Sequence, residues 1–140
     1  MSNFVLVDSN YDRVPQLICE VVNGFTNSPE YALLAESERE VPGLVCAALT
    51  RFLVRFQVEA LLGPLSSADS MTLDDCYEAI EMLIALQDAR IRTLVEDEIF
   101  ENIQGDDELW RAIRSQLGTS ARELLAKWEE KQSSRRVHEE

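Results

Sequence analysis

One segment of this chain restricts its fold more than any other, residues 42–62, PGLVCAALTRFLVRFQVEALL. It starts with a proline, which suits the first turn of a helix, and is followed by Gly63-Pro64, a strong stop signal. Apolar side chains cover most of its circumference at helical spacing, and one polar stripe remains, formed by Arg51, Arg55 and Glu59. Such a helix is stable in water when other helices surround it. The sequence therefore predicts a bundle with residues 42–62 as its largely buried central helix.

The rest of the chain has the pattern of further helices joined by short loops, so we expect an all-α, single-domain bundle of six or seven helices. The expected helices cover residues 12–23, 28–38, 42–62, 72–104, 106–118 and 120–132. Ser28-Pro29 and Thr72 are expected to start helices, and Ser120 with Glu123 forms a capping-box pattern. We expect residues 1–132 to form the bundle domain and residues 133–140 a polar, disordered tail.

The segment 72–104 leaves two alternatives open, one long helix or two shorter ones. More than thirty residues is long for a helix in a globular protein, so we expect a bend or a short break near Gln87-Asp88. Residues 65–70, which are mostly small, are expected to be a loop before it.

Negative charge dominates the composition, with 26 acidic residues against 13 basic ones and a formal net charge of −13. Such a field repels nucleic acids and anionic membranes and attracts basic partners. The first ten residues lack the pattern of a signal peptide, and three charged residues interrupt the most apolar segment, so no membrane span is expected. Cys19, Cys46 and Cys76 lie within apolar helical patterns, which is typical of reduced, buried thiols in a cytoplasmic protein.

The acidic residues are concentrated between Asp74 and Glu108, where there are twelve carboxylates and only two basic residues. Asp74, Glu78 and Glu81 share one helical face. The densest cluster is expected to be either a solvated, helix-capping surface or a docking surface for a basic partner. Its members, the candidate partner-binding residues, are Glu96, Asp97, Glu98, Glu101, Asp106, Asp107 and Glu108.

No arrangement in the sequence has the pattern of a catalytic or metal site. The acidic cluster lacks the ligand alternation of a calcium loop, and no Glu-x-x-His pair of a di-iron bundle occurs. The single histidine, His138, lies in the expected tail, away from the three cysteines. Arg51 and Arg55 are expected to be either a solvated edge, with an exposed ion pair to Glu59, or an anion clamp. We therefore predict a protein that is not an enzyme and uses no metal or cofactor.

Three segments resemble small helical bacterial immunity proteins of toxin–immunity systems: YALLAESEREVPGLVCAALTRFLVRF (residues 31–56), DEIFENIQ (97–104) and LGTSARELLAKW (117–128). The resemblance implies a cytoplasmic helical protein that binds one cognate secreted toxin or effector domain and blocks its active site or substrate groove. It supplies no site residues, so the acidic cluster is predicted on physical grounds to meet a basic surface of that partner. The alternative is an acidic secretion chaperone or adaptor that holds an effector before export.

Overall fold

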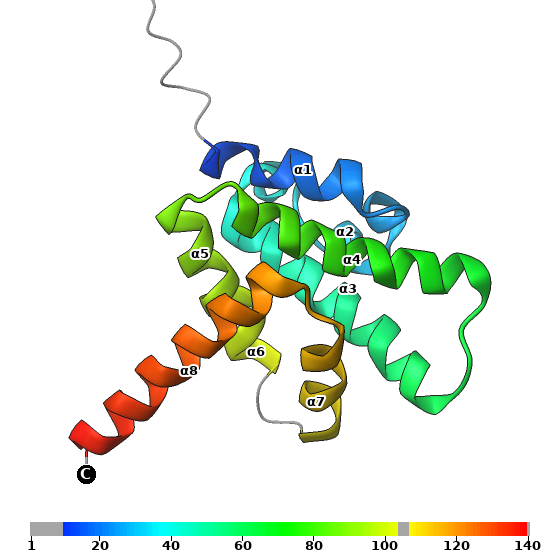
Figure 1. Cartoon of the computed structure of the whole chain (residues 1–140). Helices are drawn as coiled ribbons and strands as arrows, with labels where there is room; N and C mark the ends of the chain where they lie inside the picture. Colours follow the sequence, from blue (N-terminus) through cyan, green and yellow to red (C-terminus); the bar gives the residue numbers. More distant parts are fainter. Residues whose placement is uncertain (1–9, 104–106, 140) are drawn as a thin grey trace, which may run out of the picture.

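Helix α3 (Pro42–Leu62) runs through the middle of the bundle, as its apolar circumference predicts (Figure 1). The structure is a computed structural model and describes residues 10–103 and 107–139, with side chains as far as residue 135. The other helices are α1 (Val14–Val21), α2 (Pro29–Ala32), α4 (Ser67–Ala85), α5 (Ala89–Val95), α6 (Glu101–Ile103), α7 (Asp107–Gln116) and α8 (Thr119–Glu139). Short 3₁₀ turns (Tyr11–Arg13, Phe25–Asn27 and Glu36–Glu40) and one π-helical turn (Glu96–Phe100) accompany them.

The prediction of an all-α bundle is confirmed. No strand occurs in the part of the chain that the structure describes. Helix α5, the π turn and α6 follow one another without a break, and when they are counted as one segment, that part contains seven helices. This number lies within the expected range.

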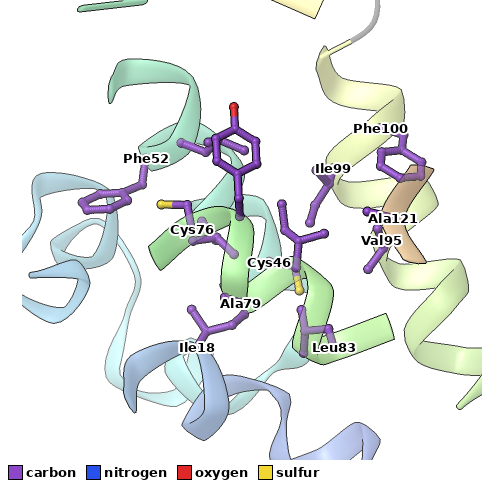
Figure 2. Close-up of a cluster of buried hydrophobic side chains, with 14 of the residues drawn as sticks. Ile18, Cys46, Phe52, Cys76, Ala79, Leu83, Val95, Ile99, Phe100 and Ala121 are labelled. Atoms are coloured by element: carbon purple, nitrogen blue, oxygen red, sulfur yellow. The ribbon is translucent and has the colours of Figure 1, made fainter. Parts of the chain in front are cut away.

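One continuous hydrophobic core joins the elements around α3. Figure 2 shows side chains from α1, α3, α4, α5, the π turn and α8 in a single cluster. The rings of Phe25 and Phe52 meet edge to face at 5.4 Å, which fastens the chain before α2 to the central helix. On the other side, the ring of Phe100 lies 5.8 Å from that of Trp128, which joins the π turn to α8. Packing on both sides buries ten residues of α3, whereas its last turn keeps exposed apolar side chains.

Helix α4 begins earlier than expected. The hydroxyl of Ser66 accepts a hydrogen bond from the backbone N–H of Asp69 at 3.1 Å and caps the helix, whereas Thr72 is buried within it. The prediction of a loop over residues 65–70 is therefore wrong for residues 67–70. No proline or glycine follows Ser66 in this segment, so the first serine after Gly63-Pro64 is free to start the helix.

The expected break near Gln87-Asp88 is confirmed. Helix α4 ends at Ala85, Gln87 adopts a left-handed backbone conformation with φ of 56°, and the carboxylate of Asp88 accepts a hydrogen bond from the Arg90 N–H at 2.8 Å. Asp88 is thus the N-cap of α5, and the segment forms two helices with a sharp change of direction.

A carboxylate from α4 caps the start of α8. Glu81 accepts hydrogen bonds from the backbone N–H groups of Ser120, at 2.7 Å, and Ala121, at 3.1 Å. These are two of the four donors that a helix leaves unpaired at its N-terminus, so the local capping box expected from Ser120 and Glu123 does not supply this cap. A Cβ atom at Gly118 would lie 2.6 Å from a Glu81 carboxylate oxygen, which explains the glycine before the helix.

The expected tail overlaps the last helix. Helix α8 continues as far as Glu139, whereas residues 133–140 were expected to be a disordered tail, and Glu140 lies outside the described residues. Polar composition alone suggested a frayed end, but the segment contains no proline or glycine to stop the helix.

We expect replacement of Glu81 by alanine to lower the free energy of unfolding by about 1–2 kcal/mol, because two N–H groups at the start of α8 lose their acceptor. Replacement of Glu78, an exposed residue one turn earlier on α4, is the matched control and should change stability by less than about 0.5 kcal/mol. Urea unfolding followed by circular dichroism measures both. Equal effects of the two replacements would contradict the assignment of Glu81 as the cap.

Candidate functional site

The residues of the predicted acidic cluster are not all exposed on one surface. Glu96 is the exception within the π turn, because its side chain is buried. Glu96 is only 8% exposed, and its carboxylate lies 3.5 Å from the Lys131 ammonium group of α8. Its negative charge is therefore used to join the π turn to α8. The prediction that Glu96 contacts a partner is corrected, because helix α8 covers this side of the π turn.

Asp97, Glu98 and Glu101 lie together at the π turn and the start of α6, and we call these three residues the acidic face. Asp97 and Glu101 are exposed and Glu98 is half-buried. None of the three forms an ion pair with any residue that the structure describes. These carboxylates therefore remain available to a basic group from outside.

The π turn that carries the acidic face is held by α3. The backbone carbonyl of Glu98 accepts hydrogen bonds from the Thr50 hydroxyl of α3 and from the Asn102 side-chain amide, each at 2.8 Å. The same hydroxyl lies 2.9 Å from the Cys46 carbonyl, so its one proton is shared between two acceptors. A π turn adds a residue to the helical repeat and leaves carbonyls displaced from their usual partners. The two side-chain donors satisfy one of these carbonyls and fix the direction of the turn.

The electrostatic environment of Glu98 differs from that of a solvated glutamate. Partial burial raises the pKa of its carboxyl group, and the adjacent charges of Asp97 and Glu101 raise that pKa further. Burial and repulsion both disfavour the ionised form, so the folded protein carries an unfavourable charge here near neutral pH. A cation beside Glu98 would relieve both effects.

A surface groove of about 560 Å³ borders the acidic face. Asp97 and Glu98 stand on its rim, and the other lining residues are Tyr11, Gly43, Ala89, Arg90, Thr93 and Leu94. The Arg90 guanidinium lies over the Tyr11 ring, 4.7 Å from its centre, and 3.7 Å from the Asp88 carboxylate. The groove thus combines carboxylates with aromatic and aliphatic surface, and it already holds one arginine over its aromatic ring.

The remaining predicted residues lie on another helix. Asp107 and Glu108 are exposed in the first turn of α7, where carboxylates favour the positive end of the helix dipole. Asp106 lies outside the described residues. Asp107 and Glu108 therefore have a local structural reason, whereas no contact within the described part of the chain accounts for Asp97, Glu98 and Glu101.

Two other charged side chains that the sequence analysis names, Glu81 and Arg55, form contacts within the protein. Glu81 is the cap of α8, so the face expected from Asp74, Glu78 and Glu81 is reduced to the exposed Asp74 and Glu78. Arg55 forms a bidentate pair with Glu30 of α2, with distances of 2.7 and 2.9 Å, and not the expected exposed pair with Glu59. An arginine held in this way joins α2 to α3 through its Nε and one Nη nitrogen.

The thiols do not resemble activated nucleophiles. Cys46 and Cys76 are completely buried, and burial raises the pKa of both thiols to about 12. The side chain of His138 lies outside the described part. Among the side chains that the structure describes, no group of three or more His, Cys, Asp or Glu residues could hold a metal ion.

No helix in the described ranges is both long enough and apolar enough to span a bilayer. Comparisons with family models, with curated proteins and with solved structures give no match.

Replacement of Glu98 by glutamine is expected to raise the free energy of unfolding near neutral pH by a few tenths of a kcal/mol, because a repelled and partly buried charge is removed. Since the folded-state pKa of Glu98 is raised, the gain is complete above that pKa. It vanishes once the pH falls below the pKa of a glutamate in the unfolded chain, where both states are protonated.

Urea unfolding at about pH 7 and about pH 3.5 measures the difference between Glu98→Gln and the unchanged protein. Asp74→Asn, on exposed α4 surface, controls for the lower total charge. A gain of the same size at both pH values would contradict the electrostatic explanation.

Proposed function

We propose that this protein is an immunity-type binding protein that neutralises a cognate secreted toxin by covering its active site or substrate groove. The acidic face, Asp97, Glu98 and Glu101, makes the central contact in this proposal, and Asp107 and Glu108 in the first turn of α7 are further candidate contacts. The observation that carries it is a set of carboxylates without internal partners around an aromatic groove.

The chemistry of the acidic face supports a basic protein as the partner. A lysine or arginine side chain has an aliphatic stem and a charged end, and the groove offers Leu94 to the stem and carboxylates to the end. Pairing with such a side chain would remove the repulsion within the acidic face. Toxins that act on nucleic acids or nucleotides need basic clefts, so a protein that blocks one is expected to be acidic where it binds.

The toxin–immunity class itself comes from the resemblance of residues 31–56, 97–104 and 117–128 to such proteins. The second of these segments contains all three residues of the acidic face. The first contains Thr50, which holds the π turn in place. One of the three segments that suggested the class therefore carries the proposed interface.

The decisive experiment reverses the charges of the acidic face after a pull-down from the source cell, with this protein as bait, has identified the partner. Asp97→Lys with Glu101→Lys should lower the association rate with that partner by about tenfold or more at low salt, and reduce protection of cells that express it. Surface plasmon resonance at several salt concentrations measures the rate.

The chain offers a closely matched control for this experiment. Asp74 and Glu78 have the same residue types, the same spacing of four on a helix and exposed side chains, so Asp74→Lys with Glu78→Lys changes the net charge equally. This variant should keep most of the association rate. If the two double variants lose binding equally, net charge alone drives association. If neither loses it, the acidic face is not the interface.

A second candidate function, a secretion chaperone or adaptor, draws support from a different surface. Where α3 ends and α4 begins, apolar side chains are exposed, with Leu62 at 83% and Met71 at 67%. Val58 and Leu61 on α3 add to this apolar end. An effector segment held before export would need such a surface. If the protein is a chaperone or adaptor, Leu62→Ser with Met71→Ser should abolish binding to an extended client segment. If it is an immunity-type protein, the same double variant should leave binding to a folded toxin domain unchanged.

A further inference from the structure

The positive charges of this acidic protein are concentrated at one end of the chain. The first 110 residues contain 21 acidic and six basic residues, whereas residues 111–138 contain three acidic and seven basic ones. The only two lysines in the chain, Lys127 and Lys131, lie four residues apart on α8 and therefore on one face of the helix.

Both lysines line a groove between α5 and α8. The groove has a volume of about 500 Å³, within the range of roughly 300–1,000 Å³ that small-molecule sites occupy. Arg92 lines it from α5 and is half-buried, so basic groups from both helices border the same space. Glu96 and Glu123 are its acidic members. Ala89 and Thr93 line this groove and also the one beside the acidic face, so the two grooves lie on two sides of α5.

The charges in this groove are incompletely neutralised. Glu96 is occupied by Lys131 at 3.5 Å, a long contact for an ion pair. Arg92 and Lys127 form no ion pair with any residue of the described part, although the chain has twice as many acids as bases. Three basic and two acidic side chains line the groove, so it keeps an excess of positive charge that an anionic group could neutralise.

The polar surroundings of the groove suit an oxyanion. Gln87 lies on its lining in the left-handed conformation that glutamine rarely adopts. Arginine recognises planar or tetrahedral oxyanions through paired N–H groups, and lysine adds a point charge.

We infer that the groove between α5 and α8 binds a small molecule bearing a multiply charged oxyanion, with Arg92 and Lys127 as its direct ligands. Lys131 can turn from Glu96 toward the same group. A diphosphate and a dicarboxylate share this chemistry, and the ligand probes below distinguish them. The site is separate from the acidic face and does not depend on the function proposed for that face.

The test titrates the full-length protein with inorganic pyrophosphate and, separately, with succinate at constant ionic strength, followed by calorimetry. One of the two should bind with a stoichiometry of one. Arg92→Gln and Lys127→Gln should each weaken binding by about tenfold or more. Arg111→Gln, an exposed base on α7 that does not line the groove, should change it by less than about twofold. Tighter binding of pyrophosphate identifies a phosphate ligand, and tighter binding of succinate a carboxylate ligand.

Circular dichroism and urea unfolding of each variant establish that it is folded, and backbone amide shifts of the unchanged protein locate the ligand independently of any substitution. Shifts concentrated on α5 and the first half of α8 support the site. The proposal is overturned if neither probe binds at about 10 mM, if all three variants lose binding equally, or if the shifts lie elsewhere.

Discussion

Burial of most of α3 is the constraint on which the rest of the structure depends. An apolar helix of 21 residues needs neighbours around most of its circumference, and α1, α2, α4, α5, α6 and α7 all contact it, while one stripe with Leu44, Arg51 and Val58 stays exposed. Two of the polar groups that this arrangement encloses are paired within it. The Tyr77 hydroxyl donates to the Gln57 side-chain oxygen at 2.7 Å, and Thr50 donates to backbone carbonyls. Unpaired polar groups in such a core would cost stability, so these contacts also select the packing.

Packing of the helices also decides which acidic side chains form contacts within the protein and which stay exposed. Glu81 and Glu96 belong to the negative stretch of the sequence, yet one caps α8 and the other pairs with Lys131. Asp97 and Glu101 come from the same stretch and remain exposed without partners. The difference arises because α8 packs across α4 and the π turn and covers only one of their sides. The candidate interface is therefore the part of the acidic stretch that α8 does not cover. For this reason the interface contains fewer acidic residues than the composition of the stretch suggests.

Charge of opposite sign on the two sides of α5 gives the molecule two distinct polar surfaces. The acidic face borders a groove with aromatic and aliphatic walls, which suits a protein side chain, whereas the groove toward α8 holds basic groups that suit a small anion. Because surface charges interact over about 8 Å at physiological salt, each groove responds mainly to its own residues and not to the net charge of −13. The net charge of the chain gives no indication of the basic groove.

The sequence by itself determined the all-α class, the central helix, the break at Gln87-Asp88 and the Ser28 cap, whose hydroxyl accepts from the Tyr31 N–H at 3.1 Å. These features depend on spacing and on contacts within a few residues, which a local pattern records. Tertiary structure alone decided the cap of α8 by Glu81, the π turn held by Thr50, the pairing of Glu30 with Arg55 and the burial of Glu96. Each joins residues 25 to 48 positions apart, and which distant side chain reaches a given group depends on how the helices pack, a property that no local pattern contains.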